Sequence, residues 1–370
     1  MLNHILRKAA AALALGAATL LPIQQAAACT SFLLKAADGG FVYGRTMEFG
    51  LALNSQIIVV PRNLAYAGTG PDGKAGTGLS WTTKYGVGGT NAFGLPVVMD
   101  GVNEAGLAGG ILYLPGLSLY QDVPAADGKS SIAAHEVLTY ALTNFATVAE
   151  VKEGLPKIKV NRSILDALKM PVPMHITLHD ATGASLVIEY IGGQLQLHDN
   201  PTTVLTNAPA FDWHVANLGN YLSLSAFNPP PLKVGSLTIS PPSTGAGAPG
   251  LPGDMSSPSR FVRAFLYSRA APVLPTTEQA SSLAFHILNN FDISPGIIRT
   301  SADSATGGGV TGIETTEWTS VVDLKAKRYM IRTYDNNQTR VLDLAKAPLD
   351  GKQISTIPLN QPATSVDVLK

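Results

Sequence analysis

The stretch Ala26-Ala27-Ala28-Cys29-Thr30-Ser31 decides how this chain is interpreted, because a run of small residues leads directly into its only cysteine. The residues before it have the composition of a secretory signal, with two basic residues, an apolar run over 9–23 and a small-residue ending. We therefore expect residues 1–28 to be a signal peptide. Cys29 would then be the first residue of an exported, periplasmic chain.

An N-terminal cysteine carries a nucleophile and a base on one residue. Its α-amine has an ordinary pKa of about 8, and its thiol titrates only slightly higher. Such a residue can attack an amide carbonyl without a histidine from elsewhere in the fold. Two simpler interpretations stay open at this point: the lipid-anchored cysteine of a bacterial lipoprotein, and an incidental thiol. The lipoprotein signal is poor, since no Leu lies three positions before Cys29.

The composition argues against several classes of partner. Lys and Arg number 26, as do Asp and Glu, and no basic tract of the kind that binds nucleic acid is present. After residue 28 no apolar stretch is long enough to span a membrane. A single Cys forms no internal disulfide, so the thiol is either reactive or irrelevant. The 342 residues of 29–370 suffice for one large core, and we expect a single domain over that range.

Motifs for other common chemistries fail. His135-Glu136 has no second His four residues on, so it is no zinc-protease motif, and His175 and His179 alternate on a predicted strand without a Cys partner. The Gly-x-Gly-x-x-Gly match at 68–73 contains a proline and precedes no apolar helix, so a surface turn is expected. No Gly-x-Ser-x-Gly elbow occurs. We expect neither a cofactor nor a metal.

The pattern of apolar residues predicts strands and helices in alternating groups. Strands are predicted at 31–34, 41–46, 56–60, 95–99, 107–113, 174–178, 185–190, 194–198, 318–323 and 327–333. Helices are predicted at 131–144, 259–271 and 277–290, with a further start at the capping box Thr147-x-x-Glu150. Residues 232–258, rich in Pro, Gly, Ser and Thr, are expected to form a loop near a pocket mouth. This order suits one α+β domain with sheets between helical layers.

The first predicted hairpin brings polar residues toward Cys29. An antiparallel return strand ends beside the start of its partner, which places Arg45 and Glu48 near the cysteine. Arg45 would lower the pKa of the thiol, and Glu48 would accept hydrogen bonds from the terminal ammonium. The simpler interpretation, a surface ion pair, stays open, and Asn103 is expected to be a turn residue.

Seven segments, in order along the chain, match the motifs of one known family. They are Cys29-Thr30, GRTME at 44–48, DGVNEAGL at 100–107, LYLP at 112–115, LTNAPAFD at 205–212, GLPGD at 250–254 with SRF at 259–261, and RTYDN at 332–336. With them the chain resembles the choloylglycine hydrolase family of N-terminal-nucleophile amidases, which includes penicillin V acylases and bile salt hydrolases. The similarity covers nearly all of 29–370.

The resemblance implies a four-layer αββα fold, with two antiparallel sheets between helical layers, and often a homotetramer. It also implies that Cys29 is the nucleophile, Arg45 its polar partner, Asn207 the oxyanion-hole amide and Arg260 a second active-site arginine. Tyr113 stands where penicillin V acylases have Tyr and bile salt hydrolases have Asn, and a backbone or side-chain donor near it is expected to hold the tetrahedral oxyanion together with Asn207. Glu48 departs from the Asp of many members.

The implied substrates are apolar acyl groups on small polar amines. Penicillin V and N-acyl homoserine lactones rank ahead of conjugated bile salts, because of Tyr113 and the predicted export. An acyl pocket is expected near Phe49, Trp81, Tyr113 and the 232–258 segment. Two other functions remain open: a lipid-anchored protein that binds acylated ligands and uses Cys29 only for attachment, and a cysteine peptidase that pairs Cys29 with a histidine.

Overall fold

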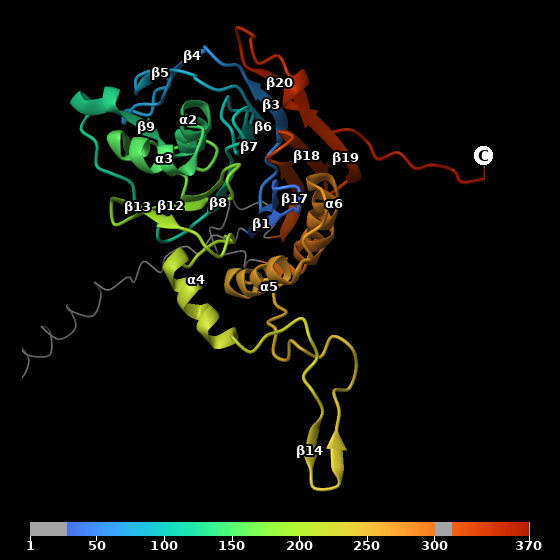
Figure 1. Cartoon of the computed structure of the whole chain (residues 1–370). Helices are drawn as coiled ribbons and strands as arrows, with labels where there is room; N and C mark the ends of the chain where they lie inside the picture. The colour runs from blue at the N-terminus through green and yellow to red at the C-terminus, as the bar shows by residue number, and fades with distance from the viewer. Residues whose placement is uncertain (1–27, 300–312, 370) are drawn as a thin grey trace, which may run out of the picture.

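The computed structural model describes residues 28–299 and 313–369 (Figure 1). The predicted signal peptide, apart from Ala28, lies outside the described residues. Two antiparallel sheets stack face to face and helices cover their outer faces, so the predicted α+β, four-layer αββα architecture is confirmed.

The first sheet is built around the strand that follows Cys29. Its order is β1-β2-β17-β18-β19, with a short strand, β16, paired to β17. Almost every residue of β2 is buried, which requires a packed layer on each of its faces. The strands are β1 (Cys29–Lys35), β2 (Phe41–Phe49), β16 (Ile298–Arg299), β17 (Ile313–Asp323), β18 (Arg328–Thr333) and β19 (Asn336–Asp343).

The second sheet has eight strands in the order β13-β12-β11-β8-β7-β6-β3-β20, all antiparallel. It joins segments far apart in the sequence, since β20 at the C-terminal end pairs with β3. The strands are β3 (Gln56–Val60), β6 (Val87–Thr90), β7 (Asp100–Asn103), β8 (Ala108–Tyr113), β11 (Met174–His179), β12 (Ser185–Ile191), β13 (Gln194–Asp199) and β20 (Ser355–Pro358).

The helices form the two outer layers. α2 (Val137–Asn144) packs on β7 and β8 of the second sheet, with α3 (Val148–Gly154) in the same layer. α5 (Ser257–Ala270) packs on β1, and α6 (Thr277–Leu288) packs on β2 and β17. α4 (Phe211–Asn217) contacts α5. One apolar core lies between the sheets and under α5 and α6, and a second lies under α2 and α3.

Several predicted boundaries differ from the structure. Residues 95–99 form no strand, and residues 100–103, expected in a turn, form β7. The helix predicted from residue 131 begins at Val137, because residues 131–133 form a strand, β9, that pairs with β10 (Lys159–Asn161). Apolar spacing alone does not separate such a short buried strand from a helix turn. The helix start predicted at Thr147 is confirmed, since Thr147 Oγ1 accepts a hydrogen bond from the Glu150 N–H. The Glu150 carboxylate accepts from the Ala146 N–H and not from that of Thr147, so only half of the predicted capping box forms.

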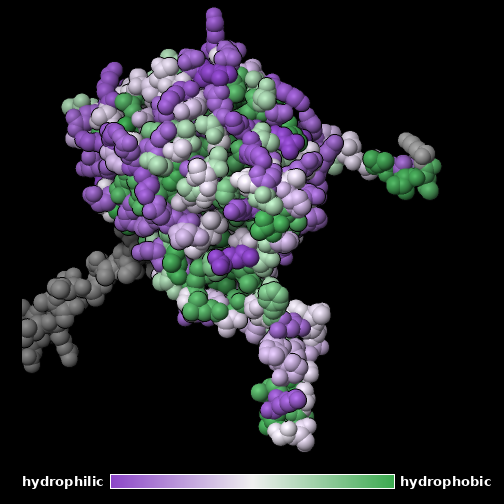
Figure 2. All heavy atoms as spheres, in the orientation of Figure 1, coloured by the Kyte–Doolittle hydropathy of each residue, from purple (hydrophilic) through white to green (hydrophobic). Residues whose placement is uncertain are grey.

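The segment between α4 and α5 is an arm that projects away from the layers (Figure 1). It ends in a two-stranded hairpin of β14 (Leu232–Val234) and β15 (Leu237–Ile239), in which every residue is exposed. The expectation that 232–258 lies at the pocket mouth is therefore wrong for this hairpin. Figure 2 shows apolar residues at the end of the arm. A separate small hairpin joins β4 (Ala65–Ala67) and β5 (Ser80–Thr82).

Candidate active site

Cys29 is the first residue of β1 and is buried, with 1% of its surface exposed. It pairs with Met47 of β2, and its Sγ lies 3.7 Å from Met47 Sδ. The backbone N–H of Glu48 acts to lower the pKa of the thiol, against the larger effect of burial. The thiol is thus held at the start of a paired strand, as a fixed nucleophile requires.

Arg45 lies on the same face of the sheet as Cys29, because side chains two residues apart on a strand share a face and Arg45 pairs with Ser31. Its guanidinium is fully buried between the sheets. Nη1 donates to Ile111 O at 2.8 Å, and the group lies 5.1 Å from the Trp318 ring centroid.

A carboxylate of the opposite sheet holds Arg45. Asp100 Oδ2 lies 3.6 Å from Arg45 Nη1 and accepts from Tyr43 Oη at 2.9 Å, while Oδ1 accepts from Ser320 Oγ at 2.8 Å. Gly110 makes room for this cluster, since a Cβ there would come within 2.6 Å of Arg45 Nη1. The sequence analysis did not single out Asp100, although the motif at 100–107 contained it.

The expectation that Arg45 lowers the pKa of the thiol is only partly met. Burial raises the pKa of Cys29, and the charges of Arg45 and Arg260 offset that rise without reversing it. The thiol is therefore protonated at neutral pH, and its activation needs a base nearby.

Asn207 and Arg260 come together at the backbone of Cys29. Cys29 N donates to Asn207 Oδ1 at 2.6 Å, and Asn207 Nδ2 donates to Tyr113 O at 2.9 Å. Arg260 Nη2 donates to Asn207 Oδ1 at 2.8 Å, while its Nη1 donates to Cys29 O and to Thr30 Oγ1. One N–H of the Asn207 amide remains free for a further acceptor.

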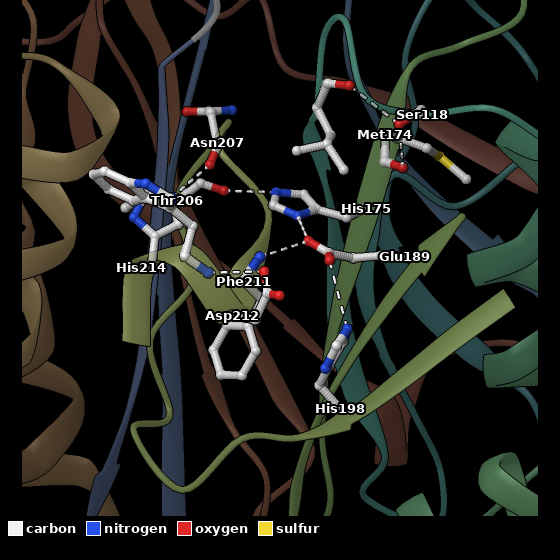
Figure 3. Close-up of polar contacts among 12 residues, drawn as sticks. Ser118, Met174, His175, Glu189, His198, Thr206, Asn207, Phe211, Asp212 and His214 are labelled. Carbon is white, nitrogen blue, oxygen red and sulfur yellow. Dashed lines mark hydrogen bonds and ion pairs between the residues drawn. The ribbon is translucent and has the colours of Figure 1, made fainter. Parts of the chain in front are cut away.

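Two histidines hold the segment that carries Asn207 (Figure 3). His175 Nε2 lies 2.7 Å from Thr206 O, and His214 Nε2 lies 2.9 Å from Asn207 O. His175 Nδ1 lies 2.9 Å from Glu189 Oε1, so the imidazole bridges that carboxylate and the backbone of the segment. His175 was not among the predicted site residues. Only its alternation with His179 along β11 indicated in which direction its side chain points.

Glu48 is buried, but its side chain does not face the thiol. Met47 pairs with Cys29 and shares its face of the sheet. Because adjacent residues of a strand point to opposite faces, the Glu48 side chain lies on the other face, which the helices cover. Its Oε1 accepts from Thr316 Oγ1 at 2.9 Å, and Oε2 has no hydrogen-bond partner among the residues that the structure describes. Burial raises the pKa of Glu48 to about 8, against the opposing effect of Arg260.

An apolar pocket opens beside Cys29. Phe49 and Tyr113 line it as expected, together with Phe93, Leu165 and Val172. Trp81 does not belong to this lining, since it stacks on Tyr66 and donates to Thr143. A thiol at the wall of an apolar cavity is placed to meet an amide with an apolar acyl group.

Within the two described ranges, no cluster of His, Cys, Asp and Glu has the composition of a metal site. In the same residues no helix combines the length and the hydropathy needed to cross a membrane.

Comparisons with known proteins identify the family of this chain. The profile of the linear amide C-N hydrolases, choloylglycine hydrolase family, matches residues 29–357. The bile salt hydrolase/transferase of Clostridium perfringens is 35% identical over 343 residues, which cover 90% of this chain and 97% of that protein.

Two solved structures have the same fold. A mutant of the conjugated bile acid hydrolase from Clostridium perfringens superposes with a TM-score of 0.79 at 32% identity, covering 92% of this chain and 99% of the other. The penicillin V acylase of Agrobacterium tumefaciens gives 0.71 at 26% identity, covering 90% and 94%. This chain therefore belongs to the choloylglycine hydrolase family and is a hydrolase of linear carbon–nitrogen amide bonds.

Proposed function

We propose that the chain, once cut after Ala28, is an acylase of the penicillin V acylase type with Cys29 as its nucleophile. The observation that carries the proposal is the position of Cys29. Its nitrogen donates a hydrogen bond to Asn207 Oδ1, and its side chain lines the apolar pocket. The acyl group would occupy the pocket, and the amine product would leave on the other side of the scissile bond.

The proposed mechanism uses the α-amine of Cys29 as the base. In the uncut chain this nitrogen is an amide donor and cannot take a proton. After cleavage the amine accepts the thiol proton, directly or through water, and the sulfur attacks the amide carbonyl. The leaving amine takes that proton from the α-ammonium of Cys29 and departs, and water hydrolyses the resulting thioester, which releases the carboxylic acid and restores the thiol.

Asn207 is the proposed oxyanion donor, through the N–H of Nδ2 that Tyr113 O does not use. Arg260 fixes the amide by donating to its Oδ1, and it also holds the backbone carbonyl of Cys29. Arg45 lies on the pocket side of the sheet and supplies positive charge near the sulfur. The proposal gives Glu48 an indirect role, through its backbone N–H and the charge balance around Arg260.

The proposed substrates are penicillin V and N-acyl homoserine lactones. Tyr113 lines the pocket and packs edge-on against Phe49, with ring centroids 5.6 Å apart. Two aromatic rings in the lining favour a compact acyl group such as an aryloxyacetyl. A second candidate is conjugated bile salt hydrolysis, which the 35% identity to the Clostridium perfringens bile salt hydrolase/transferase favours.

Parallel turnover assays separate these candidates. We expect kcat/KM for penicillin V or an acyl homoserine lactone to exceed that for glycine- and taurine-conjugated bile acids by about tenfold or more, since one misfitted group in a pocket costs about 1–3 kcal/mol. Amine release at matched substrate concentration is the measurement. A clear advantage for bile salts would reverse the ranking, while the amidase chemistry would stand.

We also propose that the chain is exported to the periplasm and assembles as a homotetramer. The arm supports assembly, because it carries exposed apolar side chains on a segment with little contact to the body. Leu222, Phe227, Leu232 and Leu237 are 85%, 83%, 61% and 59% exposed. Apolar surface of this kind on a projecting element is typical of a protein–protein contact.

Light scattering after size-exclusion chromatography tests the assembly. Chain 29–370 is expected to show about four times the monomer mass. Replacing residues 231–240 with two glycines should reduce the number of chains in the assembly, because the exposed hairpin that would make the contact is removed. Val273→Ser, at another exposed apolar site, is the matched control and should leave the mass unchanged. A monomer at every concentration, or an unchanged mass in the arm variant, would contradict the proposal.

A further inference from the structure

Two buried polar atoms of residues that line the acyl pocket have no hydrogen-bond partner among the described residues. Tyr113 Oη and His135 Nδ1 are both buried, and neither has a hydrogen-bond partner within residues 28–299 and 313–369. Both residues line the same pocket as Cys29, among side chains that are otherwise apolar. A buried polar group without a partner is costly by about 1–3 kcal/mol, so such a group in a pocket calls for an explanation.

His135 is held in place by its neighbour in the sequence. It lies in the short turn Ala134–Glu136 that precedes α2. The Glu136 carboxylate accepts from the N–H groups of Thr69 and Ala133, and from Thr69 Oγ1 at 2.8 Å. The backbone that carries the imidazole is therefore fixed, which a residue that selects a ligand requires.

The protonation states make both groups available to an oxygen. Burial lowers the pKa of His135, so the ring is neutral at neutral pH, with one nitrogen that donates and one that accepts. Burial raises the pKa of Tyr113, so its hydroxyl keeps its proton and donates. Neither group carries a charge, so an apolar acyl chain can pack against it without removing water from an ion.

We infer that the pocket selects acyl groups that carry a hydrogen-bonding oxygen, and that His135 is a specificity-determining residue. An ether, keto or hydroxyl oxygen on the acyl group would satisfy His135 or Tyr113, and a hydrocarbon acyl group would leave both unpaired. A site built to hydrogen-bond a substrate discriminates strongly against the analogue that lacks the group. The inference rests on the proposed function, since it names the acyl class of the same site.

Matched pairs of amides of one amine test the inference. Phenoxyacetyl is compared with 3-phenylpropanoyl, in which a methylene replaces the ether oxygen, and (4-hydroxyphenyl)acetyl is compared with (4-methylphenyl)acetyl. We expect kcat/KM to favour the oxygen-bearing member of at least one pair by about tenfold or more. His135→Leu should reduce that ratio toward one. His135→Asn, whose amide nitrogen can take the place of Nδ1, should retain most of it.

Product binding to the Cys29→Ala chain separates this inference from the proposed function. Phenoxyacetate and 3-phenylpropanoate are titrated by calorimetry, together with the hydroxyphenyl and methylphenyl acids, and thermal unfolding checks that each variant is folded. Tighter binding of the oxygen-bearing acids without turnover of any amide would overturn the proposed function and support the pocket inference. Equal kcat/KM within both pairs, or a ratio that His135→Leu leaves intact, would overturn the inference.

Discussion

Cys29→Ala is expected to reduce amide turnover by on the order of 10⁴-fold or more, because it removes the atom that forms the thioester. The fold should survive the substitution, since alanine keeps the strand and loses only the sulfur and its contact with Met47 Sδ. The measurement is kcat with the best amide substrate, for chains whose N-terminus has been confirmed by intact mass.

The control for this variant is the thermal unfolding midpoint. A Cys29→Ala chain that unfolds near the wild-type temperature and is inactive supports the nucleophile. An active alanine variant would remove Cys29 from the mechanism. A variant whose turnover is intact but which no longer fractionates with membranes would instead support the lipid-anchored protein.

Retention of the residues before Cys29 is expected to lower turnover by on the order of 10²–10⁴-fold, the usual contribution of a general base. Cleavage converts the nitrogen that now donates to Asn207 Oδ1 from an amide into an amine. It also removes Ala28, which is 2% exposed and therefore fills space beside the nucleophile. The comparison is between the full chain 1–370 and a chain that begins at Cys29.

A chain that begins at Ala28 is the matched control. It has a free α-amine, but on Ala28, so the nitrogen of Cys29 stays an amide although only one small residue has been added. Low activity of this chain would assign the loss to the missing base rather than to the bulk of the leader. Full activity of the Ala28 chain, with its mass unchanged after the assay, would contradict the mechanism.

The sequence could predict the local part of the site because a hairpin is governed by short-range rules. Antiparallel pairing of residues 29–35 with 41–47 follows from the apolar runs and the turn between them, and it brings Arg45 to the face of Cys29. The same alternation directs the Glu48 side chain toward the helices. The predicted contact of Glu48 with the terminal ammonium remains a prediction, and the residues described show Thr316 as the partner of its carboxyl.

Other parts of the site are assembled over long distances in the sequence, where no spacing rule applies. Asn207 lies 178 positions from Cys29, and Arg260 lies 231 positions away. Only resemblance to a family placed them near the nucleophile. Asp100 and His175 escaped the analysis because burial between packed layers, and not their sequence neighbours, turns them toward Arg45 and the Asn207 segment.

By itself the sequence determined the strand that begins at Cys29 and the position of Arg45 on its face, because these depend on residue type and on alternation along neighbouring strands. Its seven matching motifs placed the chain in its family. The tertiary structure decided the protonation of the thiol, the lining of the acyl pocket and the position of the 232–258 arm. The position of the arm follows from its exposure outside the layers, and the other two depend on which distant segments exclude water from a given atom. Burial of that kind is a property of the packed layers and is not encoded in any single stretch of the chain.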